Sequence, residues 1–346
     1  MVTSRELILG VLEGKEYETI PIWFMRQAGR YLPEYREIQA KHSFEIRCQT
    51  PEIATEITLQ PIDRFDLDAA IIFSDILIPI YAMNRGLQIK PNIGPVIDNP
   101  VRSIADIENL KQTNAKEDFP YLAESIKLTR KELKDKALIG FAGAPFTLAS
   151  YLIEGKSTKN AVITKAFAYN HPDAFHKLMK LLTNVITDQL QAQVTNGVDI
   201  IQLFDSWAGF LSSDQFNQWC LPYNQEIFAN FPEVKKIFYA RGSNHLISSA
   251  IHCGSDAISI DTTMSLSTAN QILQTKSIQG NYDPSYLLTS PNIVRKTVNT
   301  LLDEILPLRP SNYIFNLGIG IDKDSLVNNV EMMVSTVRER RRKVNE

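Results

Sequence analysis

The sequence predicts an α/β protein with the fold of a single-domain (β/α)8 (TIM) barrel. Three observations lead to this fold class. Short runs rich in β-branched and aromatic residues recur along the whole chain, each run is followed by a helical pattern, and the runs are almost continuously apolar. Strands of this kind are typical of a parallel sheet that is covered on both faces. Eight of them in succession favour a closed barrel over an open sheet.

The expected strands are short and evenly distributed. They span residues 20–25, 69–73, 137–141, 199–204, 236–239, 257–260, 277–280 and 313–317. Between the second and the third, residues 83–100 combine prolines and glycines with alternating apolar residues, which predicts a hairpin. No low-complexity linker interrupts the pattern, so we expect residues 1–346 to form one domain.

Helix boundaries are marked by proline and by capping residues. Thr50, His171 and Ser290 each precede a proline, which suits the first position of a helix. The hydroxyl groups of Thr50 and Ser290 are also expected to cap these helices. Asn244 predicts the start of a short helix that ends at Gly254, where glycine is favoured after the last turn.

Composition and charge narrow the class of protein. The chain has 36 Lys+Arg and 39 Asp+Glu, a net charge of −3, which argues against general nucleic-acid binding. The last expected helix, residues 325–343, ends in a basic run, but cations suit the C-terminal end of a helix dipole. No apolar run approaches the roughly 18 residues that span a membrane, and residues 1–10 have no secretory pattern. Three scattered cysteines form no disulfide framework. We therefore expect a cytoplasmic protein.

In a barrel of this class, functional residues lie at the carboxyl ends of the strands and in the loops that follow. Arg26 and Arg30 follow the first expected strand, and Gly29 between them allows the backbone to approach a ligand. Arginine binds carboxylate or phosphate through two parallel hydrogen bonds. The alternative is surface ion pairing with Glu34 and Glu37, and we favour anion binding because of the position after a buried strand.

Other polar residues follow the next three strands. Asp75 stands among apolar neighbours, and a buried carboxylate is costly unless it is paired, so we expect a polar partner in the site. The alternative is a structural aspartate that caps the next helix. Tyr151 and Ser206 bring hydroxyl groups near the mouth of the barrel; taken alone, Tyr151 suits ordinary packing and Ser206 suits a helix cap.

These residues belong to motifs that resemble the uroporphyrinogen decarboxylase family. In family order, the motifs occupy residues 21–35, 73–77, 143–145, 205–209, 279–281 and 316–318. The run Met-Arg-Gln-Ala-Gly-Arg-Tyr-Leu-Pro-Glu-Tyr is the most specific of them. The resemblance implies a (β/α)8 barrel, usually a homodimer, that acts in the cytosol without metal or organic cofactor. It also implies the reaction, in which uroporphyrinogen III loses CO2 from four acetate side chains and becomes coproporphyrinogen III.

The resemblance also implies roles for individual residues. Asp75 accepts the inward-pointing pyrrole N–H groups and stabilises the cation that forms during catalysis. By its position Arg26 is a candidate proton donor, but a guanidinium holds its proton tightly, so the proton donor stays unassigned. Tyr151 and Ser206 bind substrate carboxylates. The binding loop consists of Arg26, Gln27, Ala28, Gly29 and Arg30.

The sequence departs from the family motifs at two places, and two other functions compete with the decarboxylase interpretation. Ile319 stands where the family usually has histidine, and the flanking Gly318 and Gly320 are expected to leave backbone room there. Residues 260–262 differ from the family's Leu-Asp-Trp, which we attribute to local packing. One rival is a zinc-dependent methyltransferase of the same superfamily, but His252 and Cys253 are adjacent and no later cysteine completes a site. The other is a degenerate, non-catalytic tetrapyrrole-binding protein.

Overall fold

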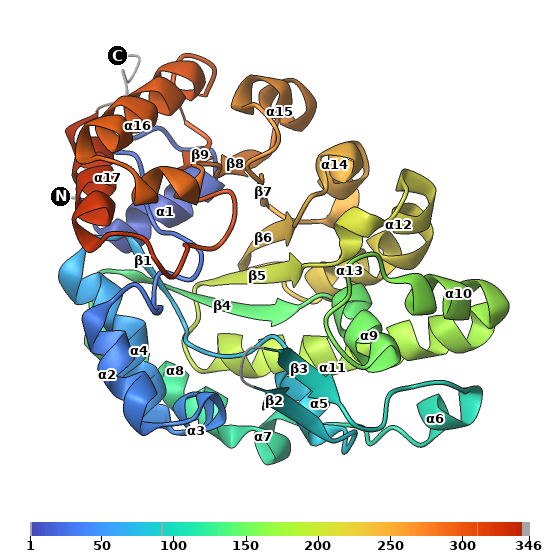
Figure 1. Ribbon diagram of the computed structural model, residues 1–346. Helices are drawn as coiled ribbons and strands as arrows, with labels where there is room; N and C mark the ends of the chain where they lie inside the picture. Colours follow the sequence, from blue (N-terminus) through green and yellow to red (C-terminus); the bar gives the residue numbers. More distant parts are fainter. Residues whose placement is uncertain (1, 91–92, 310, 341–346) are drawn as a thin grey trace.

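The computed structural model describes residues 2–90, 93–309 and 311–340 (Figure 1). Its centre is a curled, seven-stranded parallel sheet with the order β1-β4-β5-β6-β7-β8-β9, and helices surround it. The strands are β1 (Ala69–Ile71), β4 (Ala137–Gly143), β5 (Ile200–Asp205), β6 (Lys235–Ala240), β7 (Ala257–Ser259), β8 (Ser277–Gln279) and β9 (Tyr313–Ile314). The predicted α/β class with a parallel sheet is confirmed.

The expected first strand, residues 20–25, is not a strand in the structure, so eight strands are not confirmed. Ile22 forms an isolated parallel bridge with Phe315, whose N–H donates to the Pro21 carbonyl at 2.9 Å. On the other side, the Ile22 carbonyl accepts the Asp68 N–H at 2.9 Å, and the Ile22 N–H donates to the Asp68 carboxylate at 2.7 Å. The ladder is interrupted because Pro21 has no N–H and because a side chain takes the place of a backbone acceptor. We call this junction of residues 21–23 with Asp68 the seam.

The last helix reaches the seam through an ion pair. Arg338 of α17 (Val327–Glu339) lies 3.0 Å from the carboxylate of Asp68, which is almost fully buried. The Arg338 guanidinium also donates to the Asp66 carbonyl at 2.5 Å. Residues 341–343 of the expected basic run lie outside the described residues.

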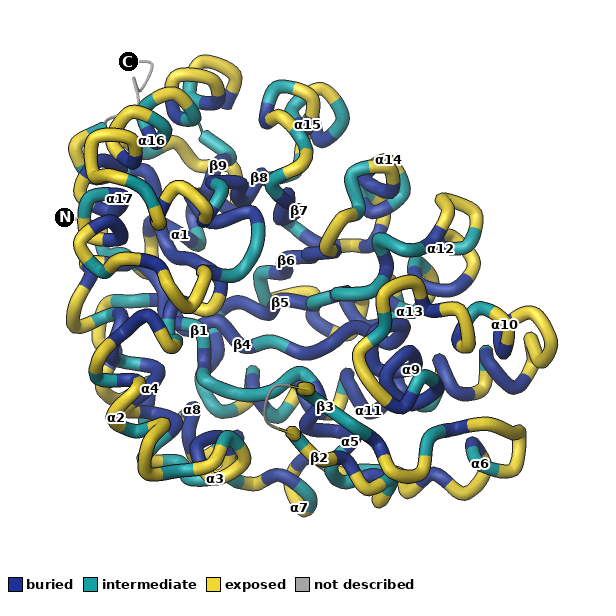
Figure 2. Tube along the Cα trace, viewed as in Figure 1, coloured by how far each residue is buried: buried dark blue, intermediate teal, exposed yellow. Residues whose placement is uncertain are grey.

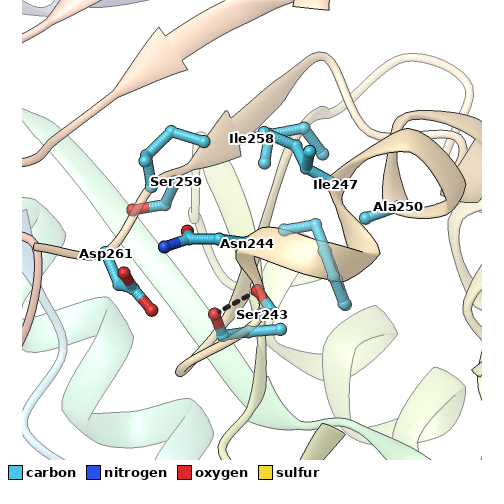
Figure 3. Close-up of a pocket in the computed structure, with 10 residues that line it drawn as sticks. Ser243, Asn244, Ile247, Ala250, Ile258, Ser259 and Asp261 are labelled. Carbon is cyan, nitrogen blue, oxygen red and sulfur yellow. Dashed lines mark hydrogen bonds between the residues drawn. The ribbon is translucent and has the colours of Figure 1, made fainter. Parts of the chain in front are cut away.

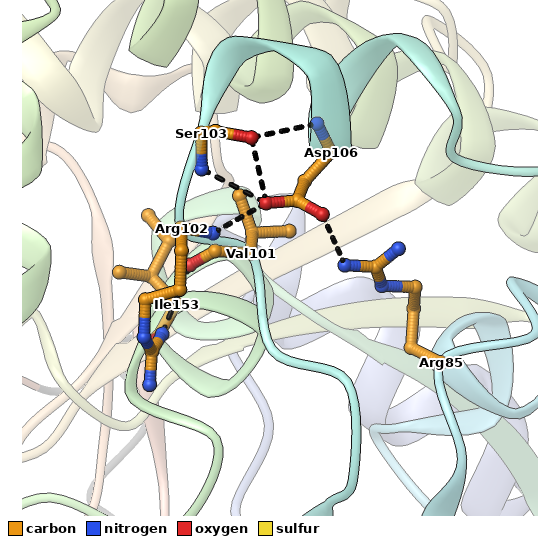
Figure 4. A network of polar contacts seen from close by, with 6 residues as sticks. All are labelled: Arg85, Val101, Arg102, Ser103, Asp106 and Ile153. Carbon is orange, nitrogen blue, oxygen red and sulfur yellow. Dashed lines mark hydrogen bonds and ion pairs between the residues drawn. The ribbon is translucent and has the colours of Figure 1, made fainter.

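The predicted hairpin is confirmed as β2 (Leu87–Lys90) and β3 (Gly94–Ile97), which pair antiparallel. It is attached to the end of α9 (Pro145–Glu154), because the Ile97 N–H donates to the Gly155 carbonyl at 2.7 Å. A polar network holds the segments on both sides of the hairpin (Figure 4). Asp106 accepts hydrogen bonds from the Arg102 and Ser103 N–H groups at 3.0 and 2.9 Å, and Arg85 donates to it at 3.2 Å.

Helices and short 3-10 turns fill the connections between strands. The helices not yet given are α1 (Ser4–Leu12), α2 (Pro33–Lys41), α3 (Phe44–Gln49), α4 (Pro51–Arg64), α5 (Ile78–Ala82), α6 (Ile104–Glu108), α7 (Ala115–Asp118), α8 (Pro120–Leu133), α10 (Val162–Asn170), α11 (Pro172–Thr195), α12 (Ser213–Trp219), α13 (Leu221–Ala229), α14 (Ile247–Ala250), α15 (Leu266–Leu273) and α16 (Pro291–Ile305). The 3-10 turns are η1 (Ala208–Phe210), η2 (Asn244–Leu246), η3 (Ile251–Cys253) and η4 (Pro284–Leu288).

The expected helix starts at the three prolines are confirmed, but two expected caps are wrong. Neither Thr50 nor Ser290 forms a side-chain capping bond. Proline at the first helical position presets the backbone angle, and these two helices start there without a side-chain cap. Asn244 is the first residue of η2 and not its cap. The helical segment formed by η2, α14 and η3 ends at Gly254, which has a left-handed conformation, as expected.

The strands of the central sheet are mostly buried (Figure 2), and the buried apolar side chains form two clusters. Inside the curled sheet, Trp23 and Met25 pack with apolar side chains from the strands and from α1. Helix α1 lies at the amino ends of the strands, since Arg5 bonds to Asp135 and Asp199, which precede β4 and β5. The carboxyl ends of the strands are therefore the open end, which we call the mouth. Within the described residues, no helix is long and apolar enough to cross a membrane.

Candidate active site

The loop after the segment 20–25 is held rigidly at the mouth. The Met25 N–H donates to Asn316 Oδ1 at 3.0 Å, and Arg26 adopts a left-handed backbone conformation with φ of 60°. Gln27 is fully buried; its amide donates to the Ala69 carbonyl at 3.1 Å and accepts the Phe24 N–H at 3.3 Å. Because the protein occupies both ends of this amide, Gln27 shapes the loop, and its predicted contact with substrate remains a prediction.

Arg26 and Arg30 present free guanidinium groups. Both residues are exposed, and neither side chain has a hydrogen bond or an ion pair with any described residue. The alternative of surface pairing with Glu34 is wrong, because Glu34 binds Arg64 at 2.9 Å. Ala28 and Gly29 are half-buried between the two arginines. The loop therefore offers two unpaired cations, as anion binding requires.

Asp75 lies in the turn between β1 and α5. Its Oδ1 accepts the Leu77 N–H at 3.1 Å, whereas its Oδ2 is buried and has no hydrogen-bond partner in the described chain. Burial raises the pKa of Asp75 to about 6, although the Leu77 and Ile76 N–H groups and Arg26 act in the opposite direction. The helix-cap interpretation accounts for one oxygen only. The other is free to accept a hydrogen bond from a ligand.

Tyr151 and Ser206 lie on neighbouring elements of the mouth. Tyr151, on α9, is buried, and its ring lies 5.6 Å from that of Trp207, centroid to centroid. Burial raises the pKa of Tyr151; Asp75 raises it further and Arg26 lowers it, so these groups share one electrostatic environment. Ser206 follows β5, is partly exposed, and its hydroxyl has no hydrogen bond to a described residue.

A buried aspartate, which the sequence analysis did not single out, positions the Ser206 segment. Asp205 Oδ1 accepts the Thr147 hydroxyl at 2.7 Å, and Thr147 Oγ1 accepts the Trp207 N–H at 3.3 Å. Burial raises the pKa of Asp205 to about 6. An acidic residue at the start of the motif at 205–209 could have indicated a functional role, but its partner Thr147 is distant in the sequence.

Aromatic side chains form the floor of the mouth. Phe204 contacts Phe141 and Tyr239 edge to face, with centroids 5.6 and 5.8 Å apart. The Tyr239 hydroxyl donates to the Gly318 carbonyl at 3.1 Å. These rings extend from adjacent strands, β4, β5 and β6. The floor is apolar and stiff, which suits a flat or ring-shaped organic ligand.

The glycines on both sides of Ile319 pack closely against other segments, because a Cβ at Gly318 would lie 2.6 Å from the Thr262 nitrogen and one at Gly320 would lie 2.6 Å from Arg26 Cδ. The expected room for a larger side chain at position 319 itself remains a prediction. Ile319 itself is half-buried.

Asp261, the residue that segment 260–262 shares with the family's Leu-Asp-Trp, joins two loops of the mouth. It accepts the Gly242 N–H at 2.6 Å and the Thr263 N–H at 2.8 Å. Gly242 belongs to the loop after β6, and Thr263 belongs to the loop after β7. Its role is therefore polar, since both carboxylate oxygens are hydrogen-bonded.

A small cavity lies elsewhere, between α14 and strands β6 and β7 (Figure 3). Its volume is about 10 Å³, and Ser243, Asn244 and Asp261 contribute its polar lining. This volume suits at most one water molecule. The cavity is too small for an organic substrate, and none of the predicted site residues lines it. The candidate site is the mouth, where those residues lie.

A sequence model described as "Uroporphyrinogen decarboxylase (URO-D)" matches residues 3–340. The chain belongs to the uroporphyrinogen decarboxylase family. Proteins named uroporphyrinogen decarboxylase from Chloroherpeton thalassium, Carboxydothermus hydrogenoformans and Corynebacterium diphtheriae are 40%, 41% and 41% identical to it. The alignments cover 97%, 92% and 96% of this chain and 97%, 92% and 99% of those proteins. The family inferred from the motifs is confirmed.

A solved structure also matches the fold of this uroporphyrinogen decarboxylase family member. A methyltransferase from Methanosarcina mazei has a TM-score of 0.84 and 18% identity, and the match covers 98% of this chain and 99% of that one. At this identity the similarity shows the fold alone. His252 and Cys253 lie in η3, which precedes β7 and so is remote from the mouth. Across the described ranges, no group of three or more His, Cys, Asp or Glu could hold a metal ion.

Proposed function

We propose that this chain decarboxylates the four acetate side chains of uroporphyrinogen III and so produces coproporphyrinogen III in tetrapyrrole biosynthesis. The observation that carries the proposal is the buried, unpartnered Oδ2 of Asp75 in the electrostatic range of the unpaired Arg26. The substrate has four pyrrole N–H donors directed inward and eight carboxylates at its periphery. An internal acceptor with cations around it complements this distribution of charge.

The proposed mechanism uses Asp75 as an electrostatic stabiliser. A proton adds to a pyrrole carbon and makes a cation; the C–C bond to the carboxylate then breaks, CO2 leaves, and the electron pair neutralises the ring. A second proton converts the resulting methylene group into methyl, while the ring carbon returns its proton. The Asp75 carboxylate stabilises the cation before CO2 departs. Arg26 remains our candidate for proton delivery.

The proposed binding residues surround this acceptor. Arg26 and Arg30 bind substrate carboxylates, and the half-buried backbone at Ala28 and Gly29 permits close approach. Tyr151 and Ser206 donate hydrogen bonds to carboxylates from the opposite side of Asp75. Gln27 contributes by fixing the loop through its bonds to Phe24 and Ala69.

Arg30→Lys tests the carboxylate contact at the exposed end of this loop. We expect KM for uroporphyrinogen to rise, because a lysine point charge cannot form two parallel hydrogen bonds. A charge-assisted hydrogen bond is worth about 1.5–3 kcal/mol, so the rise should reach about tenfold. Steady-state kinetics measure it, and an unchanged KM would contradict the role of Arg30.

The coarser features of the fold support a wider proposal. We propose that residues 20–25 act as the eighth strand of a closed (β/α)8 barrel, since hydrogen bonds at the seam join them to β9 on one side and to Asp68, just before β1, on the other. We further propose one barrel domain over residues 1–346, a homodimer, a cytoplasmic location, and catalysis without metal or organic cofactor. These statements rest on the family resemblance.

Anaerobic incubation with uroporphyrinogen III tests the proposed function directly. The products are oxidised to porphyrins and separated by the number of carboxyl groups. We expect species with seven, six, five and finally four carboxyl groups, as successive acetates are lost. Tight binding of the substrate without any loss of carboxyl groups would instead support the non-catalytic tetrapyrrole-binding function.

A further inference from the structure

Arg241 is a third unpaired arginine at the mouth. It directly follows β6, it is exposed, and its guanidinium has no hydrogen bond or ion pair with a described residue. In the part of the chain that the structure describes, only Arg26 and Arg30 share this property. Every other described arginine has a side-chain partner: Arg5, Arg36, Arg47, Arg64, Arg85, Arg102, Arg130, Arg295, Arg309, Arg338 and Arg340.

The backbone of Arg241 is fixed although its side chain is free. The N–H of the next residue, Gly242, donates to Asp261 at 2.6 Å. On the other side, a Cβ at Gly209 would collide with the Arg241 carbonyl oxygen, so the loop packs directly on the segment that carries Ser206. A backbone held in place, with the guanidinium left without a protein partner, suits a residue that binds a ligand.

The charge of Arg241 acts on the centre of the mouth. Burial and Asp261 raise the pKa of Tyr239, whereas Arg241 and Arg26 lower it. Tyr239 belongs to the aromatic floor, so both guanidinium groups lie within electrostatic range of the same ring. Strand β6 is the middle strand of the sheet, while the loop with Arg26 and Arg30 follows the seam between β9 and β1. Arg241 therefore faces that loop across the mouth.

We propose that Arg241 is a further substrate-binding residue, which binds a peripheral carboxylate of the tetrapyrrole on the side opposite Arg30. This inference rests on the proposed function, because it needs a ligand that carries carboxylates around its whole circumference. Cations on one side only would hold such a ring by one edge. A cation after β6 fixes the opposite edge and so orients the ring over Asp75.

The test compares Arg241→Gln and Arg241→Lys with the matched control Arg295→Gln. Arg295 is an exposed arginine on α16 that pairs with Glu339, so its substitution removes the same charge away from the mouth. We expect Arg241→Gln to raise KM for uroporphyrinogen by about tenfold or more, the loss of one charge-assisted hydrogen bond. Arg241→Lys should lie between it and wild type, and Arg295→Gln should have the KM of wild type.

The possible outcomes separate this inference from the proposed function. Product from the wild type together with equal KM values for Arg241→Gln and Arg295→Gln would overturn the role of Arg241 alone. Absence of product from every protein, wild type included, would contradict the proposed function. Thermal unfolding checks that Arg241→Gln is folded; if it is not, the KM of Arg241→Lys decides, and a wild-type value there would overturn the inference.

Discussion

Asp75→Asn should lower kcat by about a hundredfold or more while the protein remains folded. Asparagine keeps a neutral acceptor for pyrrole N–H groups, but it cannot supply the negative charge that stabilises the cation. Loss of one preorganised electrostatic group in an active site costs about 10²–10³ in kcat. Steady-state kinetics with uroporphyrinogen measure the change, and KM should change much less than kcat. A loss of less than about tenfold, roughly 1.4 kcal/mol, would refute the central role of Asp75.

The pH dependence of wild type and variant is the control for this result. Burial holds the pKa of Asp75 at about 6, so the wild-type kcat/KM should fall as the pH drops through that value and the carboxylate is protonated. Asp75→Asn should lack this limb of the profile. Because the folded-state pKa is raised from 3.8 to about 6, the charged form opposes folding; the cost develops as the pH rises between these two values and is fully present above about 6. The variant should therefore unfold at a higher temperature than wild type at pH 7–8.

Arg26→Ala should have the second largest effect, a fall of about a hundredfold in kcat/KM. The substitution removes an unpaired guanidinium near Asp75 and Tyr151, and a part in proton delivery would lower kcat as well as raise KM. Gly320→Ala is the matched comparison, because its added methyl group would lie 2.6 Å from Arg26 Cδ and would displace the side chain without removing its charge. We expect a smaller loss in the same direction. Wild-type kinetics for Arg26→Ala would exclude this residue from the reaction.

The parallel sheet was predictable because each of its strands coincides with a short local run of apolar residues. Residues 20–25 carry the same pattern, but their pairing depends on the Asp68 side chain, 46 residues further along the chain. A contact between residues so far apart does not change the local pattern of apolar residues, so the sequence does not reveal it. The side-chain caps expected at Thr50 and Ser290 are also absent, although both helices begin at the expected proline.

Site residues were predictable where a charged or polar side chain directly follows an expected strand. They were not predictable where the role depends on contacts that form only in the folded chain. Arg26, Arg30 and Asp75 follow expected strands, and among the described residues the two guanidinium groups and the Asp75 Oδ2 have no hydrogen-bond partner. The burial of the Gln27 amide and the polar role of Asp261 both depend on loops that meet only in the folded chain. Arg241 also follows a strand end directly, so the rule that identified Arg26 could have found it.

The seam has a consequence for how the chain acquires its structure during synthesis. Arg338 meets Asp68 there, and Asp68 in turn binds Ile22, so a residue of α17 joins two residues from the early part of the sequence. A ribosome releases Arg338 long after Asp68, and until then the buried carboxylate of Asp68 has no guanidinium partner. Early strands and helices can form in the nascent chain, yet the seam acquires all its contacts only after α17 has been made. Long-range junctions of this kind slow folding, and they make completion of the seam one of its last steps.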